Sequence, residues 1–142
     1  MRITKEALDI IRSSVENISV ETGGIMGSQN KNFVSDIIMD IPKNNEFRCY
    51  YMPNVKYFNE CIAKWNQQNK YFLGMFHTHF YNIESLSKED IKYINIIMGA
   101  MPNGVDRLFF PIYTLPQHKM ICYAAMRYND TISITNDMLE IV

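Results

Sequence analysis

The sequence has almost no surplus of charge of either sign. Its 142 residues include 14 Lys and Arg against 15 Asp and Glu, for a net charge of −1, and the pI is about 6.3. A chain without excess positive charge has no field that would attract phosphate backbones, so we expect no nucleic-acid partner. It also lacks an apolar run of membrane-spanning length and the apolar core of a secretory signal, so we expect no membrane partner.

Cysteine is scarce, which excludes two classes of small protein. Cys49, Cys61 and Cys122 lack zinc-ribbon spacing, and an odd number builds no complete disulfide framework. This favours a reducing compartment, which we expect to be the cytoplasm, with the cysteines as small core residues. Two common zinc-enzyme motifs are also missing, namely His-Glu-x-x-His and the Pro-Cys-x-x-Cys of deaminases.

The composition that is present suits a folded core: 47% of the residues are hydrophobic and 13% aromatic. We expect one domain over residues 1–142, without internal repeats or low-complexity tracts. Apolar spacing predicts three helices: Thr4 to about Ser19, Pro53 to about Asn69, and one beginning at Ser87. Strands are predicted at residues 20–28, 33–41, 48–52, 71–80, 107–114, 118–128 and 131–134, and residues 136–142 fit either a short helix or a strand. The order predicts an α+β protein with a mixed sheet packed by about three helices.

Two histidines stand at the end of the strand predicted over residues 71–80. His77 and His79 are two residues apart, so on a strand both imidazoles point to one face and can converge on one ion. An isolated His-x-His is more often a packing or surface feature than a metal site. His118 lies in a predicted turn and is interpreted as an exposed residue that binds no metal.

The third predicted helix adds a carboxylate. Ser87 and Asp90 have the spacing of a capping box, in which Ser87 caps the helix and Asp90 lies in its first turn. Two histidines and one aspartate leave a fourth tetrahedral position open, as a catalytic zinc requires. With Zn²⁺ the set would carry a net charge of plus one, enough to polarise a carbonyl and acidify water.

These residues also resemble a known family. His77-Thr78-His79, seven residues, and then Ser87-Lys88-Glu89-Asp90 match the His-x-His-x7-Ser-x-x-Asp signature of the JAMM metalloproteases, also called MPN-plus or JAB domains. Glu21-Thr22-Gly23-Gly24-Ile25-Met26-Gly27 is similar to the family's upstream Glu segment. By itself Glu21 fits a solvated residue at a helix-to-strand junction; the resemblance implies that it is the general base. The likeness continues through Asn44-Asn45, Phe47, Tyr51 and Pro53.

The resemblance implies a fold, a metal and a chemistry. The fold would be the cytidine-deaminase-like JAB/MPN fold, with a curved, mostly antiparallel sheet between helices. His77, His79 and Asp90 would hold Zn²⁺, Glu21 would move the proton, and Ser87 would donate a hydrogen bond to the oxyanion. Metal-activated water would then cleave an isopeptide or peptide bond after the C-terminal tail of a ubiquitin-like protein. The short chain resembles the stand-alone bacterial members, whose partners include activating and conjugating enzymes of the same system.

Two alternative functions remain open, and the chain departs from the family's sequence pattern at two positions. The chain could be a zinc hydrolase that releases an amino acid or short peptide from a sulfur-carrier protein, or a non-catalytic MPN scaffold. Many relatives have proline where this chain has Phe80 and Leu86. Neither residue is a ligand, so the departures predict a change in the shape of the loop between them, and in substrate fit.

Overall fold

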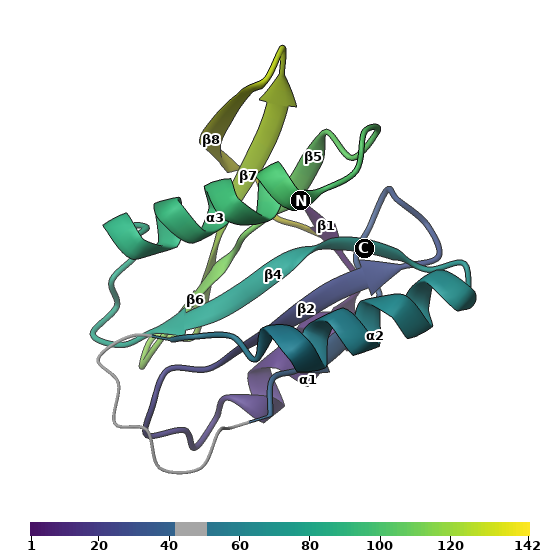
Figure 1. The fold of residues 1–142 in the computed structure, drawn as a ribbon. Helices are drawn as coiled ribbons and strands as arrows, with labels where there is room; N and C mark the ends of the chain where they lie inside the picture. The colour runs from purple at the N-terminus through teal and green to yellow at the C-terminus, as the bar shows by residue number, and fades with distance from the viewer. Residues whose placement is uncertain (42–50) are drawn as a thin grey trace.

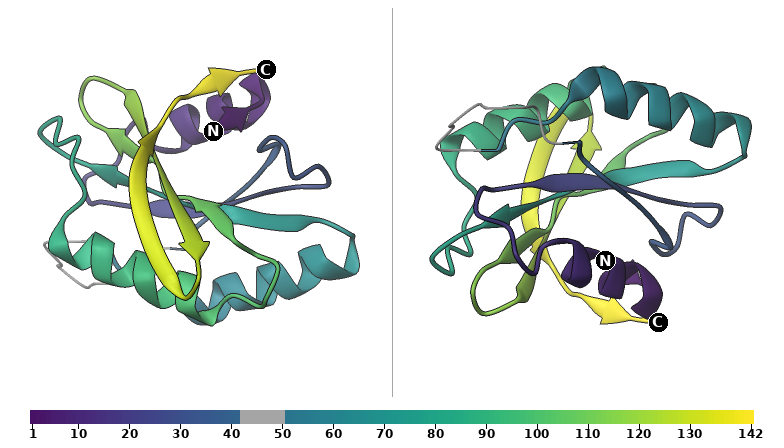
Figure 2. Two further views of the ribbon diagram at one scale, coloured as in Figure 1. Left: turned by 90° about the horizontal axis from the view of Figure 1, so that it is seen from above. Right: turned by 90° about the horizontal axis from the view of Figure 1, so that it is seen from below.

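A twisted β-sheet forms the centre of the fold, with helices on both of its faces (Figure 1, Figure 2). The structure, a computed structural model, describes residues 1–41 and 51–142. The elements in chain order are β1 (Arg2–Ile3), α1 (Lys5–Ser14), β2 (Gly23–Ser28), β3 (Asp36–Met39), α2 (Val55–Gln67), β4 (Tyr71–His79), α3 (Lys88–Ala100), β5 (Arg107–Phe109), β6 (Ile112–Thr114), β7 (Lys119–Tyr128), β8 (Thr131–Asp137) and β9 (Glu140–Ile141). The predicted α+β class is confirmed.

The main sheet is mixed and mostly antiparallel, as predicted. Its strands follow the order β3, β2 and β4, then β5 and β6, then β7 and β8. The short strands β5 and β6 follow one another between β4 and β7, and each pairs with both neighbours. Among the described strands of this sheet, only the pairings of β4 with β5 and β6 are parallel. β1 and β9 form a separate parallel pair.

The helices divide between the two faces of the sheet: α1 covers one face, and α2 and α3 cover the other (Figure 2). Alternation along β2 illustrates the division, because Met26 packs in the cluster with α1 while Ile25 packs against Phe58 and Trp65 of α2. In the described part of the chain no helix is long and apolar enough to cross a membrane.

The first helix is shorter than predicted. Thr4 is its N-cap, as expected, with the side-chain oxygen accepting a hydrogen bond from the Ala7 N–H at 3.2 Å. The helix ends at Ser14 instead of near Ser19, and Val15 is its C-cap. Val15 and Ile18 still pack against the core beyond the helix, so their apolar spacing extends past the end of the helical backbone.

The second helix begins two residues later than predicted. Asn54 is the N-cap, its side chain accepting from the Tyr57 N–H at 3.3 Å, so Pro53 precedes the cap and does not fill the first helical position. The helix ends at Gln67 rather than Asn69. The predicted strand over residues 48–52 falls largely outside the described residues, and its last two residues are not in a strand.

Several strand limits also differ from prediction. β2 begins at Gly23 instead of Val20, β3 is shorter than residues 33–41, and β8 continues to Asp137. The predicted strand over residues 107–114 is divided by Phe110 and Pro111, because proline has no N–H to continue the ladder. The C-terminal residues form a strand, one of the two forms expected.

Candidate metal centre

Strand β4 brings its two histidines together at its C-terminal end. The Nε2 atoms of His77 and His79 lie 2.9 Å apart. Thr78, between them, is buried; its side-chain oxygen accepts from the Thr22 N–H at 2.9 Å, and its own N–H donates to the Thr22 carbonyl at 2.8 Å. These bonds pair β4 with the segment before β2. The predicted convergence of the two imidazoles is present.

Asp90 completes the group from the first turn of α3. Its Oδ1 lies 3.1 Å from Nε2 of His77, and its Oδ2 lies 3.3 Å from Nε2 of His79. The three side chains could hold one metal ion, since one ligand atom from each lies within 4.8 Å of the others. His79 is buried and the other two are partly buried.

The predicted capping box positions this carboxylate. The Ser87 side-chain oxygen accepts from the Asp90 N–H at 3.1 Å, and Asp90 Oδ2 accepts from the Ser87 N–H at 2.7 Å. Asp90 therefore caps the helix and faces the histidines at the same time. Ser87 is exposed at the edge of the group, and its hydroxyl hydrogen is not used by the cap, in which the oxygen is the acceptor.

The charges of the group stabilise one another. Burial opposes charge on Asp90, but hydrogen bonds from His77 and His79 outweigh it and hold the pKa of Asp90 well below its usual range. Burial likewise opposes charge on His79, but the hydrogen bond and charge of Asp90, with a contribution from Glu21, raise the pKa of His79. The Ile83 carbonyl lies 3.1 Å from Nδ1 of His79. Because a carbonyl only accepts, it keeps a proton on Nδ1, so Nε2 is the nitrogen that would give up its proton to bind a metal.

Glu21 lies beside this group, just before β2. Gly23 pairs with His77 across the antiparallel strands, and the Thr22–Thr78 bonds continue the pairing, so Glu21 comes opposite His79. Residues paired across antiparallel strands share a face of the sheet, which directs Glu21 toward the histidines. Its Oε2 accepts a hydrogen bond from the Tyr51 N–H at 3.2 Å. The structure thus brings together all five residues singled out in the sequence.

Sequence reasoning gave Tyr51 no role, although it touches two of these residues. Its ring stacks on the His77 imidazole, with centroids 6.3 Å apart and planes 13° apart. Its hydroxyl donates to Oδ2 of Asp40 at 2.6 Å. Burial, and then the hydrogen bond to Asp40, raise the pKa of Tyr51 far above its ordinary value, so the phenol stays protonated. No local signal links residues 21, 40 and 51.

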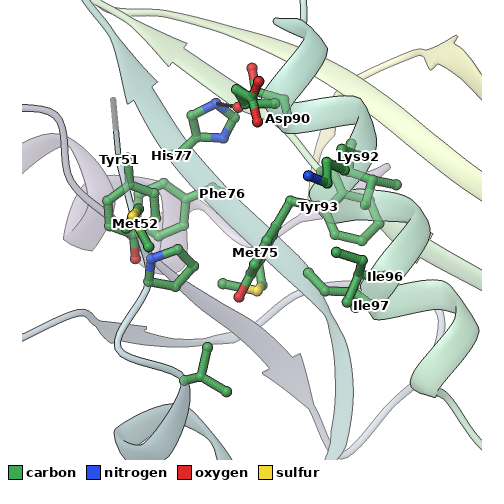
Figure 3. Close-up of a pocket in the computed structure, with 15 residues that line it drawn as sticks. Tyr51, Met52, Met75, Phe76, His77, Asp90, Lys92, Tyr93, Ile96 and Ile97 are labelled. Carbon is green, nitrogen blue, oxygen red and sulfur yellow. Dashed lines mark ion pairs between the residues drawn. The ribbon is translucent and has the colours of Figure 1, made fainter. Parts of the chain in front are cut away.

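A cleft of about 320 Å³ opens next to His77 and Asp90, over β4 and between the start of α2 and the N-terminal part of α3 (Figure 3). His77 and Asp90 form one end of it, with an ion pair between them. The rest of the lining is mostly apolar and aromatic: Tyr51, Met52, Pro53, Val55, Met75, Phe76, Tyr93, Ile94, Ile96, Ile97 and Phe110, with Glu89 and Lys92.

His118 lies outside the group. It is exposed in the turn between β6 and β7, and its Nδ1 lies 3.3 Å from the Tyr113 hydroxyl. Its exposure in a turn was predicted.

Comparison with known proteins identifies the fold. The sequence matches no protein-family model and no curated protein. The structure is similar to the solution structure of a protein from Desulfitobacterium hafniense, with a TM-score of 0.64 and 17% identity over 99% of this chain and 93% of the other. It is also similar to the crystal structure of a JAB1/MPN domain protein from Archaeoglobus fulgidus, with a TM-score of 0.58 and 14% identity over 100% and 99%. The chain therefore has the JAB/MPN fold that the resemblance implied.

Proposed function

We propose that this chain is a zinc-dependent isopeptidase or peptidase that cleaves after the C-terminal tail of a ubiquitin-like protein. The observation that carries the proposal is the convergence of His77, His79 and Asp90, with Glu21 beside them, on a JAB/MPN fold. No covalent nucleophile is needed. Cys61 and Cys122 are both buried.

The donor atoms suit zinc. Two imidazole nitrogens and a carboxylate favour Zn²⁺ over Mg²⁺ or Ca²⁺, which prefer all-oxygen sites. Ligands about 2.0–2.1 Å from zinc in a tetrahedron lie roughly 3.3 Å from one another. The observed separations are close to this value: 2.9 Å between the two Nε2 atoms, and 3.1 and 3.3 Å from these atoms to the Asp90 oxygens. When bound, zinc would supply Lewis acidity toward a carbonyl oxygen and toward water.

The remaining side chains supply proton transfer and oxyanion stabilisation. Glu21 accepts the Tyr51 N–H at Oε2, and no donor among residues 1–41 and 51–142 bonds to Oε1. In the proposed reaction Oε1 takes a proton from the attacking water and returns it to the leaving amine. Ser87 keeps its hydroxyl hydrogen for the substrate carbonyl oxygen as negative charge develops there. Both residues border the group that holds the metal.

The cleft supports a polypeptide substrate. An extended tail whose scissile carbonyl lies at His77 and Asp90 would place a neighbouring apolar side chain among Met75, Ile94 and Ile97. The cleft is large enough for one or two such side chains. In this proposal the ubiquitin-like protein is the substrate, and activating or conjugating enzymes of its system are further partners.

Elemental analysis and a cleavage assay test the proposal together. We expect wild type to bind one zinc per chain and to cleave a fusion with a ubiquitin-like protein at the end of its tail. His77→Ala should lose both properties, whereas Glu21→Gln should keep zinc and lose cleavage. A folded wild type that binds no zinc when it is supplied would favour the scaffold. Zinc binding with activity only on sulfur-carrier adducts would favour the smaller-substrate hydrolase.

A further inference from the structure

We propose that Tyr51 is a positioning residue for Glu21, and that Asp40 anchors it in place. The proposal rests on the function proposed above, in which Glu21 transfers the proton. Tyr51 joins three parts of the site, because its backbone N–H contacts Glu21, its ring contacts His77 and its hydroxyl contacts Asp40.

The contact with Glu21 fixes an otherwise mobile carboxylate. Within residues 1–41 and 51–142, the Tyr51 N–H at 3.2 Å is the hydrogen-bond donor found at Glu21. A glutamate has three side-chain torsions, so a base without such a contact would spend much of its time away from the reacting water. A backbone donor at Oε2 restricts the orientations of the carboxylate, whose charge acts on His79.

The ring of Tyr51 has a place prepared for it by a glycine. A Cβ at Gly23 would lie 2.6 Å from Cε1 of Tyr51 and 2.4 Å from the Phe76 carbonyl oxygen. Only a residue without a side chain lets the ring lie against β2 and stack on His77. Gly23, which follows Glu21 by two residues, therefore makes room for the Tyr51 ring as well as for the pairing of β2 with β4.

Asp40 holds the other end of the side chain. Its Oδ2 accepts from the Tyr51 hydroxyl at 2.6 Å and from the Asn54 N–H at 3.0 Å, and its own N–H donates to the Gly23 carbonyl at 2.8 Å. Its Oδ1 is buried without a hydrogen-bond partner in the described part of the chain. Asp40 thus ties the end of β3 to the start of β2 and to the segment that carries Tyr51.

Removing the hydroxyl oxygen of Tyr51 tests whether the residue positions Glu21 or only packs its ring. Tyr51→Phe keeps the ring over Gly23 and the backbone N–H, and removes only the bond to Asp40. Tyr57→Phe is the matched control, because it removes the same atom from another partly buried tyrosine, on α2. Gly23→Ala is unsuitable, since the new Cβ would also meet the Phe76 backbone.

We expect Tyr51→Phe to lower kcat on a ubiquitin-like fusion by about tenfold, part of the roughly 10²–10⁴ that a positioned base contributes. Zinc content should stay at the wild-type value and KM should change less than about twofold, because the three proposed ligands are unaltered and the aromatic ring stays in the wall of the cleft. Tyr57→Phe should match wild type. Asp40→Asn, which keeps an oxygen acceptor for the phenol, should lose less activity than Asp40→Ala.

A readout without catalysis follows the same contact. In ¹⁵N–¹H spectra of the metal-free protein, the Tyr51 amide should shift on Glu21→Gln, because its acceptor changes from a carboxylate to a neutral amide. In Tyr51→Phe the residue-51 amide should respond less to that substitution. If Tyr51→Phe does not fold, the comparison of wild type with Glu21→Gln still tests the proposal. A Tyr51 amide resonance that does not shift between these two proteins overturns it.

The outcomes also distinguish failure of this proposal from failure of the proposed isopeptidase or peptidase function. If Glu21→Gln is inactive while Tyr51→Phe keeps the wild-type kcat, Tyr51 does not position the base although the function stands. If Tyr51→Phe loses zinc, the residue supports the ligand His77 and the proposal is overturned. If Glu21→Gln is fully active, the assignment of the base fails first.

Discussion

Replacing Ser87 should separate its structural role from its chemical one. The hydroxyl oxygen caps α3 by accepting from the Asp90 N–H at 3.1 Å, while the hydroxyl hydrogen is proposed to stabilise the oxyanion. The backbone N–H of Ser87 donates to Asp90 Oδ2 at 2.7 Å in any variant. Alanine is a poor N-cap, whereas glycine is nearly as good as serine, and neither has a hydroxyl. Ser87→Ala and Ser87→Gly should therefore differ in stability but not in chemistry.

The expected magnitudes follow from the cap. Alanine at an N-cap costs about 1 kcal/mol and glycine a few tenths of that. An unfolding entropy of about 2.1 cal/mol/K per residue gives roughly 0.3 kcal/mol/K for 142 residues. The melting temperature should fall by about 3 °C in Ser87→Ala and by about 1 °C in Ser87→Gly. Loss of an oxyanion donor should lower kcat by about 10²–10³ in both variants.

Thermal melts of the zinc-loaded proteins and kcat on a ubiquitin-like fusion test this pair. Ser87→Thr keeps a cap and a hydroxyl, and is the control expected to stay near wild type in both measurements. Zinc content should not change, because Asp90 keeps its backbone donor. A Ser87→Gly variant with nearly full activity, or activity that falls in step with the melting temperature, would refute the chemical role.

Four further predictions concern stability and reactivity. Gly99→Ala should stabilise the fold by about 0.5 kcal/mol, because Gly99 is exposed on α3 with open space at its Cβ position. Gly74→Ala should destabilise the fold by at least roughly 3 kcal/mol, since φ is +141° and the Cβ would lie 1.8 Å from the Phe109 carbonyl oxygen. Equal midpoints of chemical denaturation for Gly99→Ala and Gly74→Ala would contradict both predictions. Asp130→Gly should stabilise the β7–β8 turn by roughly 0.5 kcal/mol, because Asn129 and Asp130 have φ of 47° and 63°, and a lowered melting temperature would contradict this. Burial raises the pKa of the Cys122 thiol to about 11, above an unfolded value of about 8.5. At pH 8 Cys122 should therefore resist iodoacetamide in the native protein and react after denaturation. Peptide mass spectrometry measures the labelling, and fast reaction in the native protein would contradict the prediction.

The metal group was predictable because its spacing is local. Residues i and i+2 on a strand share a face, and the fourth residue from an N-cap lies in the first helical turn. These two rules join His77 with His79 and Ser87 with Asp90, and the resemblance to the His-x-His-x7-Ser-x-x-Asp signature joined the two pairs. The pairing of β2 with β4 brings in Glu21, and only the family resemblance pointed to it. The roles of all five remain predictions for the experiments above.

The contacts of Tyr51 could not be predicted, because they depend on where three segments meet in space. Asp40 is eleven residues away in sequence and Glu21 thirty. Element limits were missed for a related reason. Val15 and Ile18 keep helical spacing although the helix ends at Ser14, because the following chain still packs on the same core. Apolar spacing reports burial, and burial continues where the helical hydrogen bonds stop.

The loop after β4 carries the two departures from the pattern that the sequence resembles, and its contacts explain how it keeps its shape. Tyr81 and Asn82 have φ of 57° and 55°, and the Ile83 N–H donates to the Phe80 carbonyl at 3.3 Å, so the chain reverses in a tight left-handed turn. The Asn82 N–H donates to the Leu115 carbonyl at 2.9 Å, and its side-chain oxygen accepts from the Gln117 N–H at 3.0 Å. Hydrogen bonds to the β6–β7 turn therefore hold the loop in place.

Phe80 and Leu86, which stand where the proteins that this sequence resembles often have proline, lie at the ends of this loop. Phe80 packs against the core under α1, and Leu86 packs against the core under α3, on the opposite face of the sheet. A proline would limit the backbone by its ring, whereas these side chains fix the loop ends by burial. The separation of 3.3 Å between Nε2 of His79 and Oδ2 of Asp90 thus depends on packing at both ends of the loop and on its turn contacts.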